Sequence, residues 1–203
     1  MSNKTVRIGC HSGFWGDTET AAAQLVRHGN VDYLVSDYLA EVTMSIMAAQ
    51  KLRNPQAGYA VDFVSVVMAP LAREIAEKKI KVVTNAGGVN PLACRDAVLK
   101  ACEAAGVTLK VAVVLGDDIL PRVEEFRAAG IREMDTGAEL PGKIASMNAY
   151  LGGFPIARAL AEGAAGGGGE VPFSGSARAS PSAMQRTSMP FPFDSRPQGQ
   201  TGS

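Results

Sequence analysis

Four acidic residues follow short apolar segments and could supply acid–base chemistry. They form two pairs in the sequence, Asp37 with Glu41 and Asp117 with Asp118. Several carboxylates in one cleft suit proton transfer, or the binding of a hard cation through oxygen. Each acid taken alone is more typical of a solvated surface, but Asp37 and Glu41 flank apolar residues 38–40, which should draw their loop inward. We predict that these four acids are the catalytic or metal-ligating residues, and leave the metal open.

Loop residues around these acids could bind a ligand. Gly87 and Gly88 could expose backbone amides to a phosphate or carboxylate, or could simply form a turn. Phe14 and Trp15 could form an aromatic wall for a hydrophobic ligand, or a lid over the end of a sheet. The ligand-binding residues that we predict are His11, Ser12, Phe14, Trp15, Asp17, Asn85, Gly87, Gly88 and Asn90.

Structural roles compete with chemistry at several positions. Asp17, Asn90 and Asp118 each precede a predicted helix, where their side chains could instead cap free amides. Cys10 could be a nucleophile beside a histidine, but a small buried hydrophobic role is favoured. With two histidines in the chain, one of them at a predicted helix end, a zinc site has little support, and the sequence identifies no cofactor.

The pattern of apolar segments predicts an α/β fold. Runs rich in β-branched residues alternate with segments of helical period, which is typical of βα units around a parallel sheet. Uninterrupted apolar runs suit a sheet that is covered on both faces. We expect a mostly parallel sheet with flanking helices, either Rossmann-like or part of a larger βα array. The expected strands are 5–10, 31–36, 80–84, 109–115 and a shorter 131–134; the expected helices are 19–28, 41–53, 59–78, 91–105, 119–129 and 146–162.

The predicted strands bring the candidate residues together. The candidates lie in the loops that follow the first four strands, and ligands bind at the carboxyl ends of strands in parallel sheets and βα barrels. The loops at the opposite ends look like ordinary connectors. We therefore expect one functional rim, formed by four successive loops.

Glycine and proline mark the expected helix ends. Gly29, Gly106, Gly130 and Gly163 follow helical segments and are expected to form left-handed caps. Pro70 could kink the third helix. The first three of these glycines precede expected strands, but no strand is expected after the fourth.

The chain is expected to comprise one domain over residues 1–163 and a tail over 164–203. The tail is rich in Gly, Ser, Pro and Arg and has no periodic apolar face, so we expect it to be disordered. If a strand is missing there, the fold is incomplete and the sheet has an exposed edge.

The charge of the chain argues against several partners. Lys and Arg number 20, Asp and Glu number 20, and the formal net charge is zero. We therefore expect no binding to nucleic acid or to a membrane, since neither a basic surplus nor an apolar segment of spanning length is present. A cytoplasmic protein with a small-molecule substrate is expected, with a protein partner or homo-oligomer left open.

Five segments resemble the acyclic terpene utilisation family, AtuA. The resemblance covers about residues 5–163 and has all five segments in the family's order. They are IGCHSGFWGD at 8–17, DYLAEVTM at 37–44, VVTNAGGVNP at 82–91, GDD at 116–118 and NAYLG at 148–152.

The resemblance implies a role in terpene catabolism. Family members are associated with breakdown of citronellol-type and geraniol-type terpenes. It implies an enzyme acting on a branched acyclic acid or its coenzyme A thioester, with hydratase or lyase chemistry as the hypothesis. The alternatives are a non-catalytic ligand-binding subunit of a terpene-catabolic complex and an inactive truncated product. Family members usually continue with a further strand and more, so the tail is interpreted as a frameshift or intron read-through.

Overall fold

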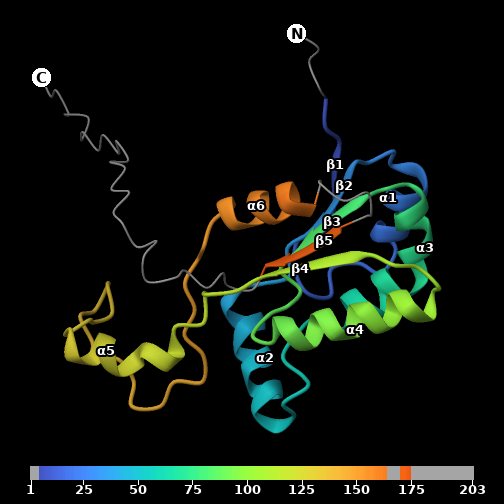
Figure 1. Ribbon diagram of the computed structural model, residues 1–203. Helices are drawn as coiled ribbons and strands as arrows, with labels where there is room; N and C mark the ends of the chain where they lie inside the picture. Colours follow the sequence, from blue (N-terminus) through green and yellow to red (C-terminus); the bar gives the residue numbers. More distant parts are fainter. Residues whose placement is uncertain (1–4, 164–169, 175–203) are drawn as a thin grey trace, which may run out of the picture.

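The computed structural model describes residues 5–163 and 170–174, which form a parallel sheet with flanking helices (Figure 1). The sheet has five strands in the order β1-β2-β3-β5-β4, and every strand pair is parallel. The predicted α/β class is therefore confirmed. The strands are β1 (Ile8–Ser12), β2 (Tyr33–Ser36), β3 (Lys81–Thr84), β4 (Lys110–Val114) and β5 (Glu170–Ser174). The helical segments are α1 (Ala21–His28), α2 (Glu41–Arg53), η1 (Phe63–Met68), α3 (Ala69–Glu77), α4 (Pro91–Ala104), η2 (Leu120–Arg122), α5 (Val123–Ala128) and α6 (Phe154–Gly163).

The register of the strands brings their carboxyl ends to one edge. Ser12 of β1 pairs with Ser36 of β2, which pairs with Thr84 of β3. Inside this row the Ser36 hydroxyl and the Thr84 hydroxyl lie 2.7 Å apart in a buried hydrogen bond. The loops that follow these three strands therefore begin side by side.

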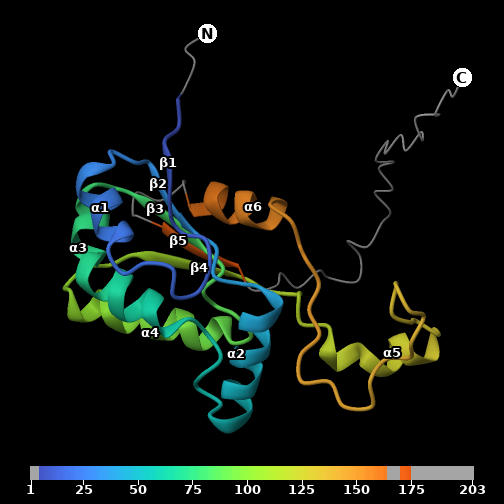
Figure 2. The ribbon, with the colours of Figure 1, turned by 180° about the vertical axis from the view of Figure 1, so that it is seen from behind.

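The helices form two unequal layers around the sheet. α1, α3 and α4 lie together on one face, and α6 lies on the other face near β4 and β5 (Figures 1 and 2). The chain passes from β1 to β4 through the first layer, then crosses to α6 and returns as β5 between β3 and β4. The direction of winding thus reverses next to β4, which creates a topological switch point of the kind where open α/β sheets bind ligands.

The core lies between the sheet and the layer of α1, α3 and α4. Leu34 and Val82 of the sheet are fully buried against α3 and α4. In α4 the buried side chains are Cys94, Val98 and Cys102, spaced four residues apart, so that they form one stripe. Burial raises the pKa of the Cys94 thiol to about 12, which keeps it protonated and inert.

The opposite face of the sheet is only partly covered. In β2, Leu34 and Ser36 are buried, whereas the alternate residues Tyr33 and Val35 are only half-buried. The predicted helices on both faces are therefore present, but in the described residues α6 covers the second face only over β4 and β5. The same alternation exposes Cys10, contrary to its predicted burial.

Two predicted elements differ in the chain between β4 and α6. Residues 131–134 form no strand, and Arg132 makes only an isolated bridge with Glu139. The helix predicted from residue 146 begins at Phe154. Residues 146–153 are not helical. Asn148 instead forms an isolated antiparallel bridge with Asp118, and Gly152 adopts a positive φ of 70°.

The third predicted helix is divided at Pro70. η1 is a π-helical segment, and α3 follows directly with Pro70 in its first turn. Proline has no N–H to donate to the preceding turn, so the wider π turn accommodates the missing bond. The predicted disturbance at Pro70 is thus a change of helix type.

Two of the four predicted glycine caps are confirmed. Gly106 and Gly130 have φ of 69° and 67°. Gly29 has a φ of −76°, and the left-handed residue there is Asn30, which tolerates this conformation better than most side chains. Gly163 lies within α6.

A strand follows α6, although none was expected. β5 pairs with β4 over five residues from Lys110↔Glu170 to Val114↔Ser174. It contains Val171 and Phe173, whose residue types favour strands. The rest of the predicted tail lies outside the described residues.

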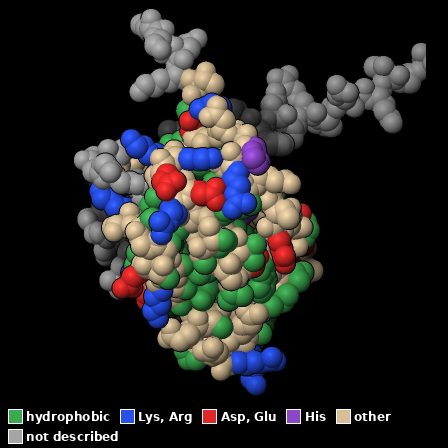
Figure 3. All heavy atoms as spheres, turned by 90° about the vertical axis from the view of Figure 1, so that its right-hand side faces the viewer, with side chains coloured by type: hydrophobic (Ala, Val, Ile, Leu, Met, Phe, Trp, Pro, Cys, Tyr) green, Lys and Arg blue, Asp and Glu red, His purple; other side chains and the backbone are tan. Residues whose placement is uncertain are grey.

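Charges of both signs are mixed on the face that carries α1 and α3. Figure 3 shows acidic and basic side chains side by side on this face. Arg27 of α1 and Glu74 of α3 form an ion pair at 2.9 Å. Among the helices that the structure describes, none has the length and apolar character needed to cross a bilayer.

Candidate functional site

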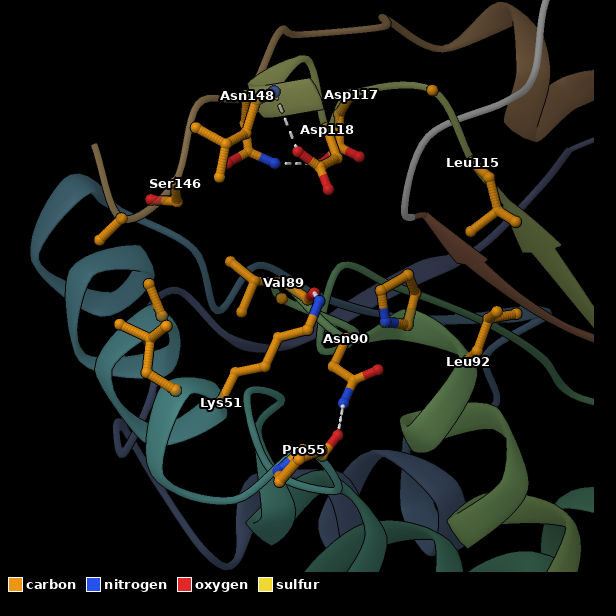
Figure 4. A pocket seen from close by; sticks show the side chains of 17 residues that line it. Lys51, Pro55, Val89, Asn90, Leu92, Leu115, Asp117, Asp118, Ser146 and Asn148 are labelled. Carbon is orange, nitrogen blue, oxygen red and sulfur yellow. Dashed lines mark hydrogen bonds between the residues drawn. The ribbon is translucent and has the colours of Figure 1, made fainter. Parts of the chain in front are cut away.

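Two adjoining clefts open at the carboxyl edge of the sheet, beside the switch point. We name the first the Lys51 cleft; it has a volume of about 700 Å³ and lies between α2, the start of α4 and the loop after β4. Figure 4 shows Lys51 reaching toward Val89, with Asp117, Asp118 and Asn148 on the opposite wall. The prediction that the loops meet at one rim therefore holds for the loops after β3 and β4.

The second cleft, which we name the Asp37 cleft, has a volume of about 740 Å³. Asp37 and Glu41 line it from the β2 side, and Asp117 lines it from the β4 side. Three of the four predicted acids thus share one cleft. Its apolar lining includes Leu39, Met44, Val114, Leu151 and Ile156.

Asp37 is held by the loop after β3. The Asn85 side-chain amide donates to Asp37 Oδ1 at 2.6 Å, and the backbone amide of Leu39 donates to the same oxygen at 3.3 Å. Asn85 Oδ1 in turn accepts from the Tyr38 backbone amide at 2.7 Å. Asn85 therefore joins the two loops and fixes the direction of the Asp37 carboxylate.

Asp117 is held in a similar way by a residue that the sequence analysis did not select. The Asn148 side-chain amide donates to Asp117 Oδ2 at 3.0 Å. Two backbone hydrogen bonds flank this contact and fix it. The Ile119 amide donates to the Met147 carbonyl, and the Ala149 amide donates to the Asp117 carbonyl, each at 2.8 Å. Asp117, Ser146 and Asn148 line both clefts, so Asp117 stands where they meet.

Asp118 has a structural partner as well as a place in the Lys51 cleft. Its Oδ1 accepts from the Leu120 backbone amide at 3.1 Å, at the start of η2. This is a local turn contact two residues along the chain; the residue at the N-cap of η2 is Ile119, and its side chain makes no capping hydrogen bond. Asp118 does not line the Asp37 cleft with the other three acids.

The residues predicted in the loop after β1 do not line either cleft. The Trp15 indole N–H donates to Asp62 Oδ1 at 2.6 Å, and the ring packs against the core. Asp17 accepts from the Gly13 amide at 2.9 Å instead of capping α1, and the Ser12 hydroxyl donates to the Phe14 carbonyl at 2.7 Å. These contacts hold the loop against the body of the protein, and both the aromatic-wall and the lid interpretations of Phe14 and Trp15 stay predictions.

His11 is buried behind this loop. It is 2 % exposed, and its ring lies edge-on to Tyr38 with the ring centroids 6.1 Å apart. Neither ring nitrogen has a hydrogen-bond partner among the residues that the structure describes. Burial lowers the pKa of His11 to about 4, despite the nearby Asp62 charge, so the ring is neutral at pH 7.

The Gly87–Gly88 turn is closed by its own hydrogen bonds. The amides of Gly88, Val89 and Asn90 donate to the carbonyls of Asn85, Gly58 and Gly87. These amides are therefore not available to an anion, and the turn interpretation is favoured for Gly87 and Gly88. The Asn90 side chain donates to the carbonyls of Pro55 and Ala57 and does not cap α4.

Lys51 lines the first cleft and was not selected from the sequence. Its ammonium donates to the Val89 carbonyl at 2.6 Å. The only sequence signal was a basic residue in the last turn of a helix, which is common because it complements the helix dipole. Among the described residues, no group of three or more His, Cys, Asp or Glu is placed to hold a metal ion.

Together, the fold and the site define an α/β protein with a partly apolar, acid-lined cleft at the carboxyl edge of a parallel sheet. The chain matches the family model described as acyclic terpene utilisation family protein AtuA over residues 6–165. The protein belongs to this family, as the five segments predicted. No curated protein and no solved structure was found to match the chain.

Proposed function

We propose that the Asp37 cleft takes the branched acyl chain of an acyclic terpenoid acid or of its coenzyme A thioester. Membership of a terpene-utilisation family supports this substrate class. The mixed lining supports it too, because Leu39, Met44 and Ile156 can contact a hydrocarbon while Asp37 and Asp117 are available to its reacting carbons.

The reaction that the site supports best is addition of water to a carbon–carbon double bond, or its reverse. The observation that carries this proposal is the placement of Asp37 and Asp117 on opposite sides of one cleft, each held by an asparagine amide. One carboxylate accepts a proton from water as the water oxygen bonds to the β-carbon of an α,β-unsaturated acyl group. The other, in its protonated form, donates a proton to the α-carbon.

The proposal is tested with geranoyl-coenzyme A as substrate and mass spectrometry to detect the hydrated product. Asp37→Asn and Asp117→Asn keep the shape of the side chain but remove its acid–base function. Each should lower kcat by about 10²–10⁴-fold, the usual contribution of a general acid or base.

Asp96→Asn is the matched control, since Asp96 lies on α4 in an exposed ion pair with Arg95. Its turnover should equal that of the unaltered protein. Unchanged turnover in both the Asp37 and the Asp117 variants would reject the catalytic proposal. Binding of the thioester without turnover in the unaltered protein would instead favour the ligand-binding subunit.

A further inference from the structure

We propose that Lys51 binds the anionic group of the ligand, so that the Lys51 cleft holds the charged end and the Asp37 cleft holds the hydrocarbon. This inference rests on the proposed function and adds to it the residue that recognises charge. It assigns to Lys51 the anion-binding role that the sequence analysis considered for Gly87 and Gly88.

The charges in the clefts support this role. Among the described residues that line the two clefts, Lys51 is the only Lys or Arg, whereas the acids are Asp37, Glu41, Asp117 and Asp118. An anion entering the site meets repulsion from these four and attraction at Lys51 alone. The backbone alternative is weakened at the Gly87–Gly88 turn, since the amides of Gly88, Val89 and Asn90 already have acceptors.

The geometry of Lys51 leaves it able to bind an anion. Its ammonium is held at the Val89 carbonyl at 2.6 Å, and it forms no ion pair within the described part of the chain. An ammonium has three N–H donors, so two remain for a carboxylate or phosphate oxygen. The Val89 contact directs the side chain toward the cleft (Figure 4), which reduces the conformational entropy lost on binding.

The position of Asp117 connects the two halves of the ligand. Because Asp117 lines both clefts, a ligand that spans them passes it between its charged end and its chain. In an α,β-unsaturated acid the reacting carbons lie directly beside the carboxylate. When the anion at Lys51 is the carboxylate of a free acid, the reacting carbons therefore lie in the Lys51 cleft, which Asp117 also lines.

The test uses decanoate and decan-1-ol, which share a chain and differ in charge, with affinities measured by isothermal titration calorimetry. Lys51→Met should weaken decanoate binding about tenfold or more, as expected for loss of one charge-assisted hydrogen bond, and should leave decanol binding unchanged. Lys51→Arg should keep most of the affinity because it keeps the charge. Lys100→Met, on an exposed position of α4, is the control and should bind both probes normally.

A competition experiment with coenzyme A alone distinguishes the source of the anion. Competition with decanoate in the unaltered protein indicates a thioester phosphate at Lys51, and absence of competition indicates the carboxylate of a free acid. Equal decanoate affinity in the unaltered protein and in Lys51→Met would overturn the inference. So would an equal loss of affinity for decanoate and decanol in the variant, or failure of decanoate to bind the unaltered protein. Lys51-dependent binding without hydration of geranoyl-coenzyme A would keep the inference and reject the proposed reaction.

Discussion

At the scale of single residues, two carboxylates that line the Asp37 cleft are each oriented by an uncharged amide. Asn85 donates to Asp37, and Asn148 donates to Asp117. An amide fixes the direction of a carboxylate without placing a positive charge beside it, as an arginine would. This arrangement suits acid–base work better than a salt bridge does.

His11 supplies a prediction about pH and stability. Its ring binds a proton with a pKa of about 6.5 when the chain is unfolded and about 4 when it is folded. Above pH 6.5 the ring is neutral in both states. As the pH falls from 6.5 to 4 the unfolded state takes up the proton first, so the free energy of unfolding should decrease by about 3 kcal/mol in this window.

The measurement is urea unfolding at several pH values, for the unaltered protein and His11→Leu. Carboxylates with lowered pKa, such as Asp32 and Glu74, also lose stabilisation in acid, and both proteins share that effect. The difference between the two proteins isolates His11, and it should grow in favour of the leucine variant as the pH falls. Parallel curves would show that His11 is not buried in its neutral form.

Sequence reasoning found the acids but not all of their partners. Asp37, Asn85 and Asp117 could be predicted because they lie within three residues of a strand end, and strand ends determine where they lie. Lys51 and Asn148 could not, because one ends a helix and the other lies in an irregular segment. The positions of Lys51 and Asn148 at the clefts depend on the tertiary path of the chain. Asn148 does lie in one of the five segments that resemble the family.

At the scale of elements, the contact between α2 and the turn before α4 shapes the Lys51 cleft. This contact depends on Gly88, which has a φ of 52°. A Cβ at this position would lie 2.3 Å from Met47 Sδ of α2 and 2.7 Å from the Gly58 carbonyl oxygen. The glycine therefore allows a close approach that no other residue permits.

Gly88→Ala should lower the free energy of unfolding by about 3 kcal/mol, through backbone strain together with overpacking. Gly106→Ala is the matched control. Gly106 also has a positive φ, 69°, but its nearest neighbour to an added Cβ is the end of the Arg73 side chain at 3.8 Å. The control should cost about 1 kcal/mol, from strain alone. Equal losses in urea unfolding would show that packing against Met47 is unimportant.

Periodic elements could be predicted from the sequence, whereas irregular ones could not. α2 and α4 lie where their apolar spacing placed them, apart from one residue at the end of α4. The failures concern residues 131–134 and 146–153, where local pattern favoured a strand and a helix. Neither segment packs into the core, so no burial of apolar side chains stabilises a helix or strand there.

At the scale of the whole molecule, the chain consists of a packed body and a lightly packed arm. The buried residues all lie before residue 115 in the part for which burial is described, and residues 115–163 contribute none. We define residues 115–153 as the arm. Figures 1 and 2 show α5, within the arm, lying away from the sheet and its helices. Composition could not reveal this division, because the arm is no more polar than a surface helix.

The arm should exchange its backbone amides faster than the body, because amide protection follows burial and packing. Hydrogen exchange followed by mass spectrometry should show rapid exchange over residues 119–145 and slow exchange in α3 and α4.

The end of the arm carries Ser146 and Asn148, which line both clefts together with Asp117. A ligand that spans the clefts should therefore slow exchange over residues 146–151 while leaving α5 unchanged. Decanoate serves as the ligand, and decanol bound at equal occupancy is the control for the charged contact. Protection of the arm equal to that of α4 before any ligand is added would show that the arm folds as part of the body.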